Sequence, residues 1–287
     1  MNPEPFLRSA RSHLPDALDL LRRLVEVNSF TTHAEGVDAV GRLTAEAFAP
    51  LGFDAEWTPS HTSGAGHHLF LRKSGIGAKP PVLLVTHSDT VFPAEEEIRH
   101  KFRWDERPAE GRIYGPGTVD NKGGTALIRM ILSILRETAP DCFENTSWLV
   151  AANAAEEVTG DDFARAATTA CGGSARAVLV FEGGPVDERG WHIVTSRKDR
   201  STWKLTVEGR AAHAGSQHRE GINAIDALAR ALPGIAALTS AEEDRTVNIG
   251  RVDGGTVVNR VPHEAFAEWE CRATSPDALR WADEFFS

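Results

Sequence analysis

The stretch PVLLVTHSDTV, residues 81–91, is apolar in its first half and polar in its second. A continuous apolar run of this length is typical of a strand that is covered on both faces of a sheet. His87 ends the run, and Asp89 follows two residues later, on the same side of an extended chain. The stretch therefore predicts a buried strand that presents an imidazole and a carboxylate at its carboxyl end.

Helices and strands alternate on both sides of this stretch, which predicts an α/β fold with a mostly parallel sheet. Past residue 190 the pattern changes to β-α-β-β-α, which predicts a separate α+β module. We therefore expect two domains, residues 1–196 and 197–287. The elements expected in the first domain are helices at 14–29, 36–51, 123–138 and 161–170 and strands at 53–58, 67–72, 81–87, 147–153 and 175–184.

Composition excludes several classes of partner. The 41 acidic and 31 basic residues give a formal net charge of -10, which argues against nucleic acid or an anionic membrane as the main partner. No run of 18 apolar residues or signal-type N-terminus is present, so we expect neither a membrane span nor secretion. The three cysteines, Cys142, Cys171 and Cys271, form no CxxC pair. Reduced thiols and a cytoplasmic location are therefore expected.

Polar residues also follow the other predicted strands. Glu156 and Glu157 come after the strand SWLVAAN, Glu182 ends the strand ARAVLVFEGG, and Asp120 stands just before the next helix in YGPGTVDNKGG. The carboxyl ends of strands in an open α/β sheet border one crevice. We therefore expect these carboxylates to converge with His87.

Imidazole and carboxylates together are the donors that zinc or cobalt takes in mixed nitrogen and oxygen sites. Without a cation the carboxylates would repel one another, and Asp120 could bridge two ions. Asp89 can accept the second ring N–H of His87 and so fix its tautomer.

Each of these features also has an ordinary explanation. A single histidine at a strand end is usually satisfied by a hydrogen bond, and a Glu-Glu pair is usually solvated. GPGTVDNKGG could be a turn or a phosphate cradle, but it lacks the GxxxxGK[ST] spacing, so a nucleotide-binding protein is disfavoured. The joint occurrence at the edge of one predicted sheet favours a metal site.

Four motifs in this order resemble the zinc-dependent exopeptidase and deacylase family of carboxypeptidase G, acetylornithine deacetylase, succinyl-diaminopimelate desuccinylase and aminoacylase. The resemblance runs from about residue 14 to the end and is closest in character to carboxypeptidase G. The motifs are HSDTV (87–91) for HxDTV, YGPGTVDNKGG (114–124) for GxGxxDxKGG, AAEEVTG (154–160) for the EE-G element and FEGG (181–184) for the E-P element.

The resemblance implies two zinc ions per subunit, which cobalt could replace. His87 and Glu182 would hold one zinc, Glu157 would hold the other, and Asp120 would bridge them. Glu156 would be the general acid and base for metal-activated water, with Asp89 assisting. The implied reaction is hydrolysis of an amide next to a free carboxylate, in a peptide or an N-acyl amino acid.

The second module resembles the family's inserted lid and dimerisation domain, which implies a homodimer. His213 in GRAAHAG resembles the histidine that reaches across the dimer to polarise the scissile carbonyl. Asn259 in GGTVVNRVP and Arg272 in WECRA resemble residues that bind the substrate carboxylate. The resemblance also implies a cis bond between Asp120 and Asn121.

Family chains normally return to the catalytic domain after the lid and supply one more histidine to the second metal site. This sequence reaches Ser287 inside the lid. We therefore expect that the C-terminal part of the catalytic domain is missing and that the Glu157 site is one ligand short. A truncated, non-catalytic protein that binds metal or dimerises is the alternative hypothesis.

Overall fold

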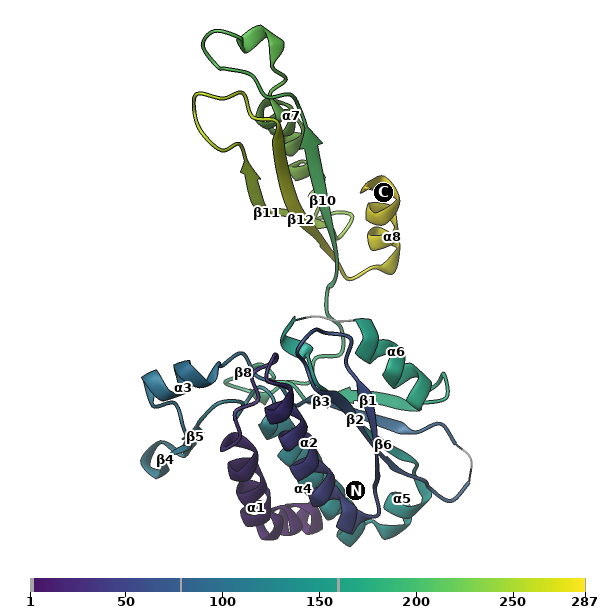
Figure 1. Ribbon diagram of the computed structural model, residues 1–287. Coiled ribbons are helices and arrows are strands. Elements are labelled where there is room, and N and C mark those ends of the chain that lie inside the picture. The colour runs from purple at the N-terminus through teal and green to yellow at the C-terminus, as the bar shows by residue number, and fades with distance from the viewer. Residues whose placement is uncertain (1–2, 78, 159–160, 287) are drawn as a thin grey trace. The chain divides into compact units, whose positions relative to one another are not determined.

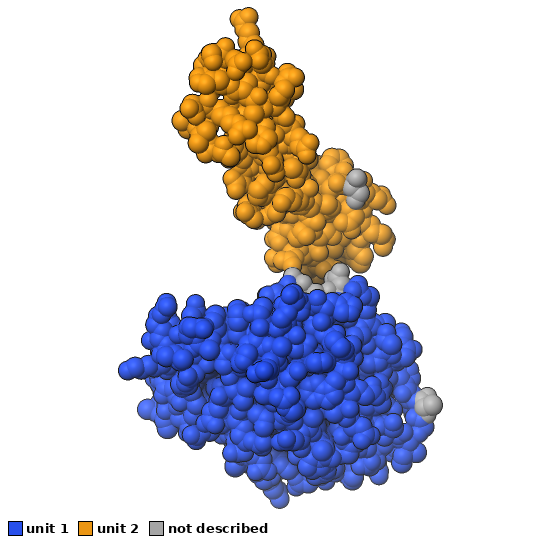
Figure 2. All heavy atoms as spheres, viewed as in Figure 1, with its two compact units in different colours: residues 1–185 blue, residues 186–287 orange. Residues whose placement is uncertain are grey.

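The computed structural model describes residues 3–77, 79–158 and 161–286. Thr159 and Gly160, which end the motif AAEEVTG, and Ser287 lie outside these ranges. The chain divides into two compact units, Met1–Pro185 and Val186–Ser287, which Figure 2 colours separately. The sequence predicted a catalytic domain, 1–196, and a lid domain, 197–287. Because these domains are defined by their roles, that division stays a prediction.

Unit 1 is built around a five-stranded mixed sheet of order β1-β2-β6-β3-β7. β3 pairs in parallel with β6 and β7, whereas β1 with β2 and β2 with β6 pair antiparallel. The expectation of a mostly parallel sheet was therefore too strong, because the short segment between β1 and β2 reverses the chain as a hairpin without a crossover helix. The strands are β1 (Asp54–Pro59), β2 (His67–Lys73), β3 (Val82–His87), β6 (Trp148–Asn153) and β7 (Ala177–Val180).

Helices cover both faces of this sheet (Figure 1). Among the described residues, no helix is both long and apolar enough to cross a lipid bilayer. The helices of unit 1 are α1 (Glu4–Val25), α2 (Ala34–Phe48), α3 (Ala94–His100), α4 (Lys122–Thr138), α5 (Pro140–Asn145) and α6 (Asp161–Ala170). Its shorter elements are the 3₁₀ turns η1 (Ala49–Leu51), η2 (Pro108–Glu110) and η3 (Glu156–Val158) and the hairpin of β4 (Asp105–Arg107) and β5 (Arg112–Tyr114).

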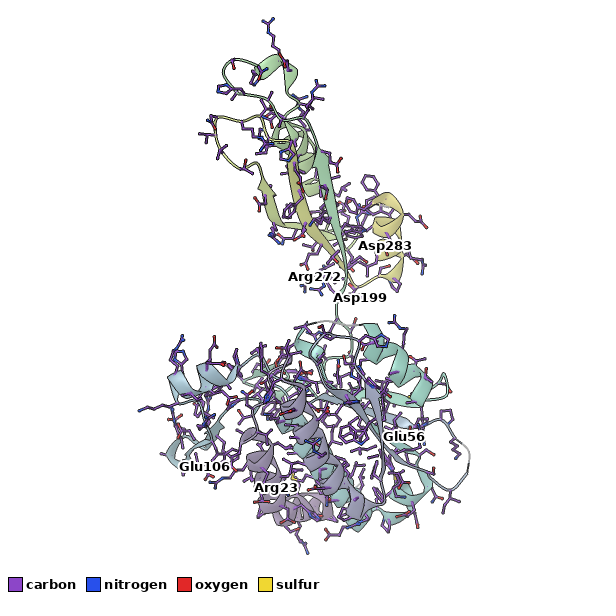
Figure 3. All side chains as sticks on the ribbon, in the orientation of Figure 1. Arg23, Glu56, Glu106, Asp199, Arg272 and Asp283 are labelled. Atoms are coloured by element: carbon purple, nitrogen blue, oxygen red, sulfur yellow. The ribbon has the colours of Figure 1, made fainter. Side chains whose placement is uncertain are left out.

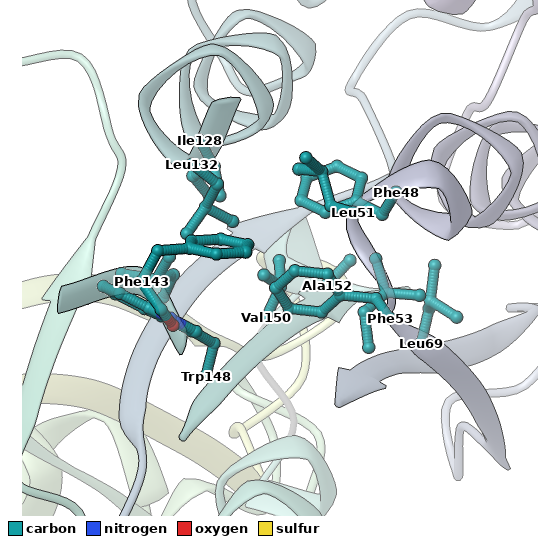
Figure 4. Close-up of a cluster of buried hydrophobic side chains, with 12 residues drawn as sticks. Phe48, Leu51, Phe53, Leu69, Ile128, Leu132, Phe143, Trp148, Val150 and Ala152 are labelled. Atoms are coloured by element: carbon teal, nitrogen blue, oxygen red, sulfur yellow. The ribbon is translucent and has the colours of Figure 1, made fainter. Parts of the chain in front are cut away.

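The two faces of the sheet are buried against different helices. Leu69 and Leu71 of β2 pack with side chains of α2, α4 and α5, whereas Phe70 between them packs with α6. The larger cluster includes Leu132 of α4 and Val150 of β6 and is drawn in Figure 4. Burial on both faces explains why the central strands lack alternating polar residues. This core fixes the strand ends that carry the polar motifs.

Unit 2 is a three-stranded antiparallel sheet of order β10-β12-β11 with two helices packed on it. Leu228 of α7 and Leu279 of α8 belong to the same buried cluster as Trp269 of β12, so both helices cover one face. The order of elements is the β-α-β-β-α order that the sequence predicted. The elements are β8 (Val186–Asp187), β9 (Gly190–Trp191), β10 (Asp199–Glu208), η4 (His218–Glu220), α7 (Ala224–Ala236), β11 (Thr246–Gly254), β12 (Glu264–Ala273) and α8 (Pro276–Phe286).

The core of unit 1 can be tested on one helix. Leu132 of α4 is fully buried, whereas Leu127 of the same helix is 43% exposed. We expect Leu132→Ala to lower the free energy of unfolding by about 2–5 kcal/mol, because it leaves a cavity. Leu127→Ala should lower it by less than about 1 kcal/mol. Urea unfolding followed by tryptophan fluorescence measures both, and equal losses would contradict this packing.

Candidate metal centre

His87 is the last residue of β3, and its side chain is 1% exposed. Its Nε2 atom lies 2.6 Å from Oδ1 of Asp120 and 3.6 Å from Oε1 of Glu182. Its Nδ1 atom lies 3.2 Å from Oδ1 of Asp89. The imidazole is therefore surrounded by carboxylates on both of its nitrogen sides.

His87, Asp120 and Glu182 form a group in which one ligand atom from each lies within 4.8 Å of the others. In the parallel register Val85 of β3 is opposite Val180 of β7, so His87 and Glu182 both follow two residues later at the same edge. Asp120 comes from the turn before α4. Distant segments thus meet because neighbouring parallel strands end together.

Asp89 connects this group to the following loop. The carboxylate is fully buried, and its Oδ2 atom accepts a hydrogen bond of 2.7 Å from Thr31 Oγ1. The backbone N–H groups of Glu156 and Glu157 donate to Oδ1 and Oδ2 over 3.1 and 3.3 Å. With His87, four donors therefore saturate both oxygens. Burial alone would raise the pKa of Asp89, but the hydrogen bonds from His87 and Thr31 lower it below its ordinary value.

The charges of the centre are strongly coupled. Burial lowers the pKa of His87, but the hydrogen bond and charge of Asp89 and the charges of Glu182 and Asp120 raise it to about 9. Loss of solvent raises the pKa of Glu157 to about 7, and the charge of Asp120 adds to this shift. Burial also raises the pKa of Glu182. Positive charge, either a proton or a cation, is therefore favoured at this site.

Glu156 and Glu157 begin η3, which is separated from the end of β6 by Ala154 and Ala155. The three-residue group found among the described residues does not include Glu157. Its carboxylate is nevertheless near enough for the charges of Asp120 and His87 to act on it. The side chain of Glu156 is exposed at the same loop. The predicted ligands and base thus lie at one edge of the sheet, but only three of them are within ligand distance of one another.

Two residues of this centre were missed in the sequence. Asn121 donates from Nδ2 to Oε1 of Glu182 over 2.7 Å, and Thr31 donates to Asp89. Asn121 is adjacent to Asp120 in the motif YGPGTVDNKGG, so its place in the motif could have predicted that it lies in the centre. Thr31 is 58 residues from Asp89 and had none. The bond between Asp120 and Asn121 is cis, as predicted.

The predicted residues of unit 2 are not all brought together. Asn259 is close to the His213 loop, because its carbonyl accepts a hydrogen bond from the Ala214 backbone N–H. Arg272 lies at the other end of β12, next to Asp199 in Figure 3, about 27 Å along the strand from residue 264. Its guanidinium donates to the carboxylate of Glu270. Within one chain, Asn259 and Arg272 therefore do not form a common carboxylate site.

A mixed α/β sheet with a histidine–carboxylate group at its parallel strand ends, followed by an α+β unit, is typical of an α/β protein with a metal-capable site and an accessory module. Comparison with known proteins gives relatives of the same kind. Residues 195–284 match the family model of the peptidase dimerisation domain. Carboxypeptidase G2 from Pseudomonas sp. (strain RS-16) is 28% identical over 221 residues, which cover 77% of this chain and 51% of that protein.

Solved structures share the fold. Aminopeptidase PepT from Bacillus cereus gives a TM-score of 0.71 at 21% identity and matches 92% of this chain and 68% of its own. An M20 family metallo-carboxypeptidase from Sulfolobus solfataricus gives 0.63 at 18% identity, over 94% of this chain and 76% of its own. A dinuclear metal-binding M20 peptidase from Bacillus subtilis gives 0.60 at 14% identity, over 96% and 68%.

The chain is thus a homologue of carboxypeptidase G2, and its structural neighbours include M20 family peptidases. It spans about half the length of the curated relative that it matches.

The role of Asp89 as an anchor can be tested by zinc binding. Asp89→Asn keeps the shape but replaces a charged acceptor by an amide, which weakens the hold on the Glu156 loop and on the His87 ring. The backbone carbonyl of residue 89, 3.1 Å from His87 Nδ1, remains. We expect zinc affinity to fall about 10–100-fold, as measured by competition with a chelator. The matched control is Asp38→Asn, which changes another Asp–His pair, with His67, away from the centre. Unchanged affinity in Asp89→Asn would contradict the role of Asp89.

Proposed function

We propose that this protein is a metal-dependent amidohydrolase that cleaves an amide bond next to a free carboxylate, in a peptide or an N-acyl amino acid. The convergence of His87, Asp120 and Glu182 carries the proposal. Kinship to carboxypeptidase G2 supports the choice of hydrolysis over other metal chemistry.

The donor set fits a divalent cation. One imidazole nitrogen and two carboxylate oxygens are the ligands that zinc takes in catalytic sites, and cobalt accepts the same donors. His87, Asp120 and Glu182 would hold the first ion, and Asp120 and Glu157 would hold a second. The Asp120 side chain is 60% exposed, which leaves the group open to solvent. When bound, zinc would lower the pKa of water and polarise the amide carbonyl.

Glu156 is proposed as the general acid and base. Its backbone is fixed by Asp89, and its exposed carboxylate has no role as a ligand in this assignment. It would accept a proton from the attacking water and donate it to the nitrogen of the leaving amine. Asp89 would keep the ring of His87 oriented through Nδ1.

Unit 2, most of which matches the peptidase dimerisation domain, is proposed to form a homodimer and to bind substrate. Gly215 and Ser216 donate backbone hydrogen bonds to Nδ1 of His213, so the proton of the neutral ring is on Nε2. That N–H would donate to the scissile carbonyl oxygen in the partner's active site. Asn259, beside it, would bind the substrate carboxylate. Arg272 lies at the far end of β12. It would therefore bind the carboxylate of a different substrate molecule, or act in the active site of a different subunit, from Asn259 of the same chain.

Substitution of the proposed acid and base tests the reaction. We expect Glu156→Gln to lower kcat about 10²–10⁴-fold on N-acyl amino acids or dipeptides, because the amide cannot carry the proton. Zinc content should stay at the wild-type value. Steady-state assays with the full-length protein and added zinc, together with metal analysis, measure both quantities.

The matched control is Glu46→Gln, which changes an exposed glutamate of α2 that is not part of the metal-ligand group. Normal kcat in Glu156→Gln would exclude the mechanism. Zinc binding with no hydrolysis of any amide by the wild type would favour the alternative of a non-catalytic metal-binding or dimerising protein.

A further inference from the structure

A second buried histidine–carboxylate pair contacts the segment that leads to Glu156 and Glu157. His68 of β2 and Asp162 at the start of α6 are both buried, with side chains 1% and 9% exposed. Their side chains approach to 3.1 Å between Nε2 and Oδ2. Neither residue belongs to the metal-ligand group, and the sequence motifs include neither.

Both ring nitrogens of His68 are used. The backbone N–H of Ala154 donates to Nδ1 over 3.1 Å, and a ring nitrogen that accepts a hydrogen bond carries no proton. Nε2 therefore carries the proton and donates it to Asp162. An imidazolium has no free lone pair, so only the neutral ring in this tautomer can make both bonds.

Asp162 holds that tautomer in place. Its Oδ2 atom also accepts the backbone N–H of His61 over 2.6 Å and the hydroxyl of Ser60 over 3.2 Å. Burial alone would raise the pKa of Asp162, but these hydrogen bonds and His68 hold it well below its ordinary value. The ring of Phe163 packs 5.3 Å from the ring of His68 between centroids. The imidazole is thus fixed by a charged acceptor and an aromatic neighbour.

The hydrogen bond to Ala154 lies two residues before Glu156. Asp89 holds the next part of the same segment through the N–H groups of Glu156 and Glu157. The segment is therefore held by two side chains from different parts of the chain, His68 on β2 and Asp89 after β3. Loss of the His68 anchor would leave the start of the loop free to shift.

We propose that His68, with its tautomer set by Asp162, is a positioning residue that fixes the loop of Glu156 and Glu157 through the Ala154 backbone. The consequence for catalysis rests on the proposed function, whereas the consequence for the loop does not. A displacement of about 1 Å in a reacting group can lower a rate on the order of 100-fold, so a small shift of this loop is sufficient.

Two substitutions that each keep one of the two hydrogen bonds separate this role from simple core packing. In His68→Asn the side-chain oxygen occupies the region of Nδ1 and can still accept from Ala154. In His68→Gln the amide nitrogen occupies the region of Nε2 and can still donate to Asp162, but no acceptor is left at the Nδ1 position. Both variants lose the ring contact with Phe163. They differ in which hydrogen bond they keep and in one methylene group of side-chain length.

Hydrogen exchange of the peptide covering residues 153–158, followed by mass spectrometry, is the first readout. We expect exchange to become at least about 10-fold faster in His68→Gln and to change less than about 3-fold in His68→Asn. Exchange in α4 should not differ between the variants, which separates a local effect from global unfolding. Equal exchange of the loop peptide in the two variants would overturn the proposal.

The second readout is kinetic. We expect kcat in His68→Gln to fall on the order of 10–100-fold with little change in KM, and His68→Asn to rescue most of it. His67→Asn is the control for an adjacent but 44% exposed histidine. If the wild type hydrolyses no amide, the proposed function fails while the exchange result still decides the role of His68.

A second pair of variants serves if the His68 proteins do not fold. Asp162→Asn keeps an oxygen that can accept from Nε2, whereas Asp162→Ala removes the acceptor and frees the ring to take the other tautomer. We expect faster exchange of residues 153–158 in Asp162→Ala than in Asp162→Asn, by at least about 10-fold. Equal rates in these two variants would also overturn the proposal.

Discussion

The centre depends on one buried carboxylate. Asp89 has no exposed surface, and its two oxygens accept from the His87 ring, the Thr31 hydroxyl and two backbone N–H groups of the following loop. An unpaired charge at this depth would be strongly unfavourable, so all four donors are held at once. The same interaction that keeps Asp89 ionised therefore orients a proposed metal ligand and the loop of the proposed acid and base.

The sheet supplies the frame for this interaction. β3 lies between β6 and β7 with both pairings parallel, so three chain segments leave the same edge within a few residues of one another. Helices on both faces bury β3 and β6 and allow little movement at their ends, whereas the side chains of β7 are exposed. The carboxylates around His87 raise its pKa to about 9, and loss of solvent, with the charge of Asp120, raises the pKa of Glu157 to about 7. The fold thus holds several carboxylates close together, in an arrangement that a cation would stabilise.

Much of this arrangement could be predicted because buried parallel strands have continuous apolar sequences and their polar ends share an edge. The direction of β1 and β2 could not, since short strands do not encode their partners. α1 begins at Glu4 rather than at residue 14, because polar contacts such as Ser9 with Glu137 hold its first turns without an apolar pattern. The separation of Asn259 from Arg272 could not be predicted, because the order of the motifs does not show that most of strand β12 lies between the two residues.

The most direct measurement is anomalous diffraction at the zinc absorption edge from crystals of the protein grown with zinc. The account predicts an anomalous peak for a zinc ion that is bonded to His87 Nε2 and to the carboxylates of Asp120 and Glu182. The carboxylate of Asp89 should still accept a hydrogen bond from His87 Nδ1. A peak bonded to other residues, with His87 still hydrogen-bonded to Asp120, would contradict the claim that these segments converge to bind a cation.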